Sequence, residues 1–159
     1  IYAAHTNMDK AADGVSALMA QKLGLQGCVP LTPDNFGMVG NLEKECQVEE
    51  LAARTKEAFG VDVIRCSAPL ENKVSRIAVC GGSGKSFIAD AMQQGAQVYI
   101  TGDITYHDFY AEKGFMVMDI GHYFSEYGIV GLFANIVSKN FPNFAVSIST
   151  KNNNPIYYY

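Results

Sequence analysis

Short apolar segments alternate with segments of helical spacing along most of this 159-residue chain. The apolar segments predict strands, because consecutive apolar side chains suit a strand that is buried on both faces. We expect strands at residues 1–4, 61–66, 74–80, 97–101, 115–120 and 144–149. Apolar positions at helical spacing, ended by Gly or Pro, predict helices at residues 13–23, 48–59, 86–94, 108–113 and 123–140.

The alternation of the two kinds of segment indicates the fold class. Strands that are joined through helices need crossover connections, so we expect an α/β fold with a mostly parallel sheet and helices on both faces. Residues 25–42 follow neither spacing and are rich in Gly and Pro, which predicts a loop and a domain boundary. Residues 152–159 are polar and aromatic, and we interpret them as a terminal extension.

Composition narrows the class of protein. The chain is 48% hydrophobic and 18% charged, with a net charge of -4 and no Lys/Arg-rich segment, which disfavours nucleic acid as a partner. No apolar run approaches the roughly 20 residues that cross a bilayer, so no membrane association is expected. The four cysteines form no C-x-x-C pair and lack the context of an activated nucleophile, so we expect a cytoplasmic protein without a thiolate zinc site.

Polar residues gather where the predicted strands end. In an open parallel sheet, ligands bind beyond the carboxyl ends of the strands. All three histidines follow such ends, together with several carboxylates and a Gly-rich turn. These residues are His5, Asp9, Gly81, Gly82, Ser83, Asp103, His107, His122 and Glu126. The clustering indicates a functional site at one edge of the sheet.

His122 and Glu126 are spaced i, i+4 at the start of a predicted helix. Both side chains therefore project from one face and can converge on one cation. The helix N-terminus favours an ionised Glu126 and a neutral His122, which are the forms that bind metals. The alternative is that Glu126 stabilises the first helical turn and His122 caps it.

Three other polar residues have equally simple alternatives. Asp9 precedes a helix and fits an N-cap or a turn as well as a metal ligand. Asp103 fits a turn, and His107 fits the hydrogen-bonded start of a helix. Their position at the same sheet edge favours a role in the site.

The segment Cys80-Gly-Gly-Ser-Gly-Lys-Ser86 lies between a strand and a helix. It is not a Walker P-loop, because the first Gly of that motif would have to stand at Val79. The backbone N–H groups of Gly81 and Gly82, with Ser83, can hold an anion. A tight turn that lets the helix pack on the sheet is the alternative.

Four ordered motifs together resemble one known family. They are Tyr2-Ala-Ala-His-Thr-Asn-Met-Asp9, Val79-Cys-Gly-Gly-Ser-Gly84, Val98-Tyr-Ile-Thr-Gly-Asp103 with Tyr106-His107, and Gly121-His-Tyr with Ser125-Glu126. The chain resembles the Nif-three-like proteins, also called type 2 homologues of GTP cyclohydrolase I. The match extends over nearly the whole chain.

The resemblance implies two similar α/β domains around a dinuclear divalent-metal site of zinc, iron, manganese or magnesium, in a hexamer built from dimers. It assigns Asp9, His122 and Glu126 as metal ligands and brings His5 and His107 close to them. The family also supplies an adjacent His-His pair upstream of the first strand, and this sequence has none. Residues 1–33 would then end a truncated first domain, residues 34–159 would form the second, and we expect further residues before Ile1.

Two functions follow from this resemblance. In the first, the protein is a metal-dependent hydrolase of a nucleotide-like substrate, with His107 or His5 transferring protons and residues 81–83 and Asp103 contacting the substrate. In the second, it is a non-catalytic metal-binding scaffold or regulatory protein that acts through a ring-shaped homo-oligomer.

Overall fold

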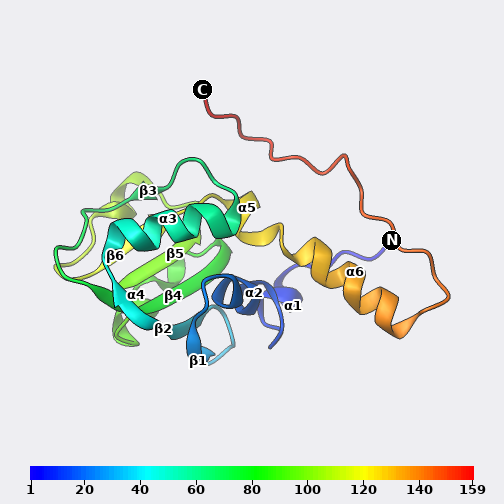
Figure 1. The fold of residues 1–159 in the computed structure, drawn as a ribbon, viewed down its shortest axis with the longest axis horizontal. Coiled ribbons are helices and arrows are strands. Elements are labelled where there is room, and N and C mark those ends of the chain that lie inside the picture. The colour runs from blue at the N-terminus through cyan, green and yellow to red at the C-terminus, as the bar shows by residue number, and fades with distance from the viewer.

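The computed structural model describes residues 1–159 (Figure 1). Its strands are β1 (Gln26–Pro30), β2 (Met38–Cys46), β3 (Arg65–Cys66), β4 (Val74–Ser83), β5 (Val98–Gly102) and β6 (Met116–Asp119). Its α-helices are α1 (Thr6–Asp9), α2 (Val15–Lys22), α3 (Val48–Phe59), α4 (Ile88–Gln93), α5 (His122–Glu126) and α6 (Ile129–Asn140). Two 3-10 helices, η1 (Lys85–Phe87) and η2 (Tyr106–Phe109), complete the elements.

The six strands form one mixed sheet in the order β1-β2-β4-β5-β6-β3. Strands β4, β5 and β6 are parallel neighbours, and β1, β2 and β3 add antiparallel pairs at the two sides. The expected α/β fold is therefore confirmed, with the parallel part at the centre of the sheet. The parallel order brings the carboxyl ends of β4, β5 and β6 to one edge of the sheet. The predicted site residues that follow these strands therefore lie at the same edge.

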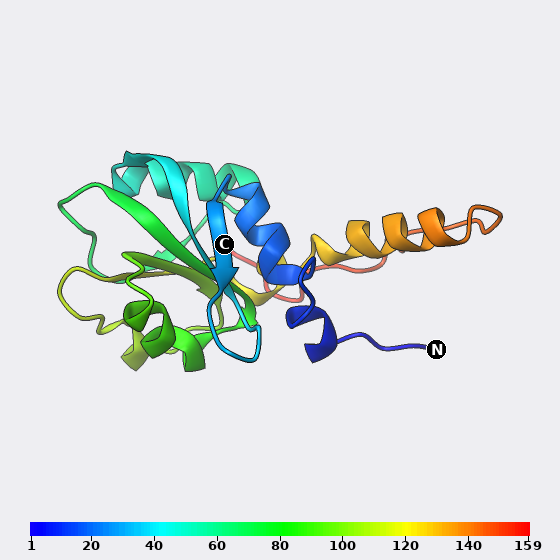
Figure 2. The ribbon, with the colours of Figure 1, turned by 90° about the horizontal axis from the view of Figure 1, so that it is seen from below.

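Two apolar layers cover the sheet. Ile77 and Val79 of β4 face the core beneath α2 and α3, whereas Ala78 and Cys80 face the layer that contains α4. Figure 2 shows α2 and α3 on one side of the sheet and α4 on the other. Alternate residues of one strand thus anchor both layers, because successive strand side chains point to opposite faces.

Helix α3 follows its prediction at both ends. It begins at Val48 and ends at Phe59, and Gly60 then adopts a left-handed conformation with φ 66°. Glycine accepts this conformation without the steric penalty of a Cβ atom. Leu51 and Phe59 are buried against the sheet, which orients the helix.

The expected loop at residues 25–42 is wrong, since β1 and the first half of β2 form an antiparallel pair there. Most of β1 is exposed at the edge of the sheet, so its residues carry no apolar pattern. Pro30 has no N–H group, which an edge strand tolerates because the N–H groups on its open side have no partner strand. The Gly and Pro residues of this segment therefore concealed an edge strand from the sequence pattern.

The expected strands at residues 1–4 and 144–149 are not formed. Both segments lack a neighbouring strand, and Ile1, Tyr2, Phe144 and Ile148 are exposed. A strand needs a partner for its backbone groups, so an apolar pattern alone does not produce one. The strand expected at 61–66 is likewise reduced to β3, which pairs only with the end of β6.

The helix expected at 123–140 is two helices, α5 and α6, separated at Tyr127 and Gly128. Figures 1 and 2 show α6 projecting from the body of the molecule, and none of its residues is buried. The helices expected at 86–94 and 108–113 are a 3-10 turn followed by α4, and the short η2. No helix combines the length and apolar character that spanning a membrane requires.

The division of the chain at residues 33 and 34 remains a prediction. Within the structure, however, α2 and β1 belong to the same body as the later elements. Met19 and Leu23 of α2 pack in one core cluster with β4, and β1 pairs with β2.

Candidate metal centre

His122 and Glu126 lie on α5, which follows the parallel strand β6 at the carboxyl edge of the sheet. The Nε2 atom of His122 lies 3.2 Å from Oε1 of Glu126. The i, i+4 spacing thus brings the two donor atoms together as expected. Gly121, with φ 81°, allows the chain to turn directly from β6 into this helix.

The other ring nitrogen of His122 is held by Asp103. Nδ1 lies 2.7 Å from Oδ2 of Asp103, which follows β5 and has a left-handed φ of 54°. A metal-bound histidine commonly has its outer nitrogen on a carboxylate in this way. Asp103, which we expected at the substrate, is thus engaged in orienting His122.

The ionisable groups at this edge of the sheet change one another's pKa values. Burial lowers the pKa of His122, but the hydrogen bond to Asp103 and the nearby Glu126 carboxylate outweigh burial and raise the pKa overall. The two carboxylates therefore favour the protonated form of His122, which is opposite to the effect expected from the helix N-terminus. The five-residue α5 contributes little dipole against two flanking carboxylates.

Burial also raises the pKa of Glu126, and the Asp9 carboxylate adds to the shift while His122 opposes it. For Asp9, burial raises the pKa, and His5 and His122 oppose the shift. Both carboxylates are therefore partly desolvated without enough positive charge to compensate. A bound cation would favour their ionised forms.

The Gly-rich end of β4 supports α5. The N–H of Gly82 donates to Oγ of Ser125 at 2.9 Å, and that hydroxyl donates to the carbonyl of His122 at 2.7 Å. A Cβ atom at Gly82 would overlap Oε1 of Glu126, so only glycine permits this close approach. The N–H that we expected to hold an anion is therefore used within the chain.

Asp9 lies in α1 and His5 directly precedes this helix. Neither side chain makes a hydrogen bond or an ion pair with His122 or Glu126. The Nδ1 atom of His5 lies 2.9 Å from the Thr6 hydroxyl, and the His5 side chain is exposed. No three side chains among the His, Cys, Asp and Glu residues lie close enough together to hold a metal ion. Imidazole nitrogen and carboxylate oxygen suit a divalent cation, but the structure gathers only two of the three expected ligands.

His107 is separate from this group. Its imidazole is exposed on η2, packs edge-on against Tyr106 at 5.4 Å, and makes no hydrogen bond to the His122 and Glu126 side chains. The structure therefore does not bring this histidine to the expected centre.

Two residues that support the centre were not predicted as site residues from the sequence. Ser125 was noted only as part of the last family motif. Asp119 ends a strand and is only 3% exposed. It accepts hydrogen bonds from the N–H groups of Ile104 at 2.9 Å and Gly121 at 2.7 Å, and it pairs with Arg65. Asp119 thereby fixes the loops that carry Asp103 and His122.

The terminal residues also reach the centre. The hydroxyl of Tyr123 donates to the carbonyl of Asn152 at 3.1 Å. His122 and Glu126 share a cavity of about 310 Å³ with Asn152, Asn154 and Ile156. The segment that we interpreted as a simple extension therefore forms one wall beside the two ligands.

Covalent catalysis by the nearest cysteine is not favoured. Cys80 is buried, and burial raises the pKa of its thiol to about 11. The thiol is consequently protonated at neutral pH and is a poor nucleophile.

Known proteins are similar to this chain in sequence. The Duf34/NIF3 (NGG1p interacting factor 3) family matches residues 1–155. The chain is 37% identical to a GTP cyclohydrolase 1 type 2 homolog of Nostoc sp. over 79% of this chain and 51% of that protein. It is 38% identical to the protein of the same name from Streptococcus pneumoniae over 77% and 50%, respectively. The chain thus spans about half the length of these curated relatives.

Solved structures share the fold. A Bacillus cereus protein related to NIF3 matches all of this chain and 73% of its own with a TM-score of 0.87 at 21% identity. Staphylococcus aureus hypothetical protein SA1388 matches 98% of this chain and 67% of its own with a TM-score of 0.84 at 26% identity. The family match, which covers nearly every residue, shows that the chain belongs to the Duf34/NIF3 family.

Proposed function

We propose that the protein is a divalent-metal-dependent hydrolase of a nucleotide-like substrate, and that this chain supplies Asp9, His122 and Glu126 to a dinuclear site. The observation that carries the proposal is the position of His122. One nitrogen is oriented by Asp103 and the other faces Glu126, 3.2 Å away. An ordinary helix cap would need neither partner.

The proposed substrate class comes from the relatives' name, GTP cyclohydrolase 1 type 2 homolog. A divalent cation bound here supplies an activated water at neutral pH. Asp103 orients the His122 imidazole, and Gly82 leaves room for Glu126. His5, beside Asp9 at the same edge, is the proposed proton carrier, because His107 lies apart.

Metal binding is measurable on this chain before any turnover. Titration with Mn²⁺ or Zn²⁺ should show binding that is lost in Glu126→Ala and retained in Glu57→Ala, whose carboxylate is exposed on α3. GTP hydrolysis is then followed at saturating metal in both variants and the parent. Equal metal binding by Glu126→Ala and the parent chain would overturn the proposed site.

One observation favours a second candidate, a metal-binding scaffold that works through a ring-shaped oligomer. Helix α6 projects from the body with no buried residue although it is largely apolar. In this case the molecular mass by light scattering should rise with added metal, while GTP is not consumed. A mass that is independent of metal in the parent and in Asp9→Ala would contradict the scaffold.

A further inference from the structure

Residues 152–158 lie beside the candidate metal centre without belonging to a helix or a strand. Figure 1 shows the chain after α6 as an extended segment that runs back toward the body of the molecule. The hydroxyl of Tyr123 donates to the Asn152 carbonyl at 3.1 Å. This is the only hydrogen bond between residues 152–158 and residues 1–140. The segment is therefore attached to the centre at a single polar point.

The side chains of this segment lie on both sides of the contact between His122 and Asp103. Asn154 and Ile156 line the cavity of about 310 Å³ that contains His122. Ile156 and Tyr158 line a neighbouring cavity of about 300 Å³ that contains Asp103. Because Nδ1 of His122 and Oδ2 of Asp103 are only 2.7 Å apart, the two cavities flank one pair of residues. Ile156 lines both cavities and therefore stands between them.

The apolar contacts of the segment are weak. A Cβ atom placed on Gly121 would lie 3.6 Å from the Tyr158 hydroxyl, so this side chain approaches the backbone at the start of α5. Ile156 nevertheless remains 52% exposed and Tyr158 remains 57% exposed. A segment with few buried apolar contacts opens more readily than the core of the same protein. Residues 152–158 can therefore detach while the sheet stays folded.

The space beside the centre is small while the segment is attached. Cavities for drug-sized ligands measure roughly 300–1,000 Å³, so each of the two cavities is at the lower limit. The side chains of His122 and Asp103 remain 46% and 45% exposed, so water and small ions reach them. A ligand of nucleotide size needs more room than one cavity provides, and Ile156 blocks its extension into the other.

We propose that residues 152–158 form a strap that admits only small ligands to the candidate metal centre until it detaches from Tyr123. Water and inorganic phosphate reach the attached form. In the detached form the two cavities merge, and a larger substrate can bind across His122 and Asp103. The inference rests on the proposed function for the identity of the site, and adds how access to that site is regulated.

The three histidines of the chain allow a test without metal or turnover. Diethylpyrocarbonate, which is larger than a phosphate ion, acylates neutral imidazole, and mass spectrometry gives its rate at each histidine in EDTA at about pH 8. Tyr123→Phe removes the one hydrogen bond to the strap, so modification of His122 should become about two- to tenfold faster. A chain that ends at Lys151 lacks the strap and should show at least the same increase.

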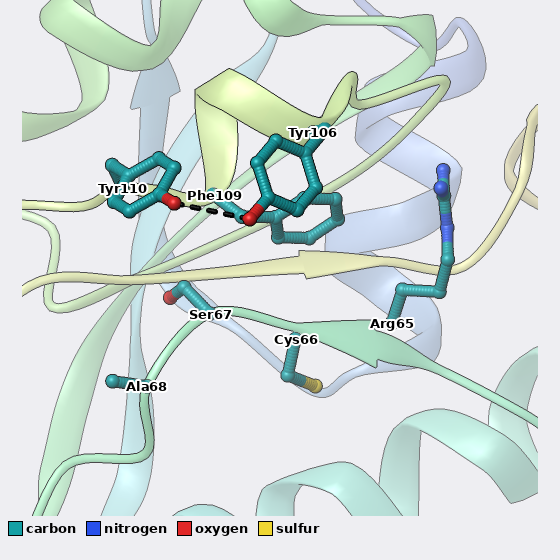
Figure 3. Close-up of a pocket in the computed structure, with 7 residues that line it drawn as sticks. All are labelled: Arg65, Cys66, Ser67, Ala68, Tyr106, Phe109 and Tyr110. Carbon is teal, nitrogen blue, oxygen red and sulfur yellow. Dashed lines mark hydrogen bonds between the residues drawn. The ribbon is translucent and has the colours of Figure 1, made fainter.

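Two controls use other positions of the chain. His107 is the internal reference, because it packs against Tyr106 at 5.4 Å. Tyr106 lines a cavity of about 490 Å³ between β3 and η2 (Figure 3), and no residue of the strap reaches that cavity. Tyr157→Ala is the matched variant, since Tyr157 is 75% exposed and lines none of the three cavities. Neither His107 in any variant nor His122 in Tyr157→Ala should change its rate.

A smaller probe separates access from loosening of the fold. Deuterium exchange at the Cε1–H of His122 needs only water, so its rate should be equal in the parent and the shortened chain. Equal modification of His122 by diethylpyrocarbonate in these two chains would overturn the strap. Faster deuterium exchange at His122, or an equal increase of modification at His107, would also overturn it, because either result would show a loosened fold.

The outcomes separate this inference from the proposed function. Absence of metal binding by the parent chain, with the difference in His122 modification intact, would remove the hydrolase and leave the strap. Unchanged His122 modification in the shortened chain, with metal binding intact, would do the reverse.

Discussion

Two histidines follow parallel strands at the same edge of the sheet, yet their surroundings differ. His122, after β6, is held between Asp103 and Glu126. His107, after β5, is exposed against Tyr106. Both histidines therefore lie at strand ends, but only His122 has a carboxylate beside each of its ring nitrogens. A sheet edge thus gathers polar residues, and local turns decide which of them come into contact.

The largest expected difference is in metal binding when either His122 or His107 is replaced by alanine. We expect His122→Ala to abolish binding of Mn²⁺ or Zn²⁺, because it removes the nitrogen that faces Glu126. His107→Ala should bind as the parent chain does. Calorimetric titration measures both, and a weaker affinity in His107→Ala would show that His107 also contributes to metal binding.

Asp103→Asn tests the part of the difference that is due to orientation. The amide cannot supply the carboxylate that stabilises the His122 ring, so metal affinity should fall about 10- to 100-fold. The pKa of His122, measured by NMR in the metal-free chain, should also fall, since Asp103 raises it. An unchanged His122 pKa would show that the 2.7 Å contact carries no weight in solution.

Ser125→Ala tests the support beneath α5. The buried N–H of Gly82 would lose its acceptor, and the unfolding free energy should fall by about 1–3 kcal/mol. Metal affinity should fall only a few-fold, because His122 and Glu126 remain. Urea denaturation measures the first effect, with Ser83→Ala as a control at an exposed hydroxyl nearby.

The smallest expected effect concerns pH. Asp9, His122 and Glu126 all have folded pKa values raised above their usual values. Each therefore stabilises the metal-free fold below its unfolded pKa, and this stabilisation is lost as pH rises through the folded pKa. In EDTA, Glu126→Gln should gain melting temperature relative to the parent chain as pH rises from about 5 to about 8. A gain on acidification instead would contradict these shifts.

The parts of the fold that the sequence predicted share one property, which is burial within the chain itself. Helix α3 and strands β4, β5 and β6 lie within two residues of their expected ends, except that β4 extends through Ser83. Their apolar side chains find partners nearby, so pattern and structure agree. Strand β1 was missed because it is an exposed edge with little apolar pattern.

In the candidate site, too, some contacts were predictable from the sequence and others were not. The spacing of His122 and Glu126 predicted their convergence, since one helical turn places both on the same face. The pairing of Asp103 with His122 and of Gly82 with Ser125 could not be predicted from spacing. These contacts join β5 and β4 to α5, and their geometry depends on left-handed residues such as Asp103 and Gly82.

By itself, the sequence determined the alternation of strands and helices, the family, and the His122 and Glu126 pair. All three depend on local spacing or on the order of residues along the chain. Only the tertiary structure decided that Asp103 orients His122, that His107 stands apart, and that residues 1–4 and 144–149 remain unpaired. Those outcomes depend on contacts between distant segments, because a strand or a ligand set forms only where packing brings its partners together.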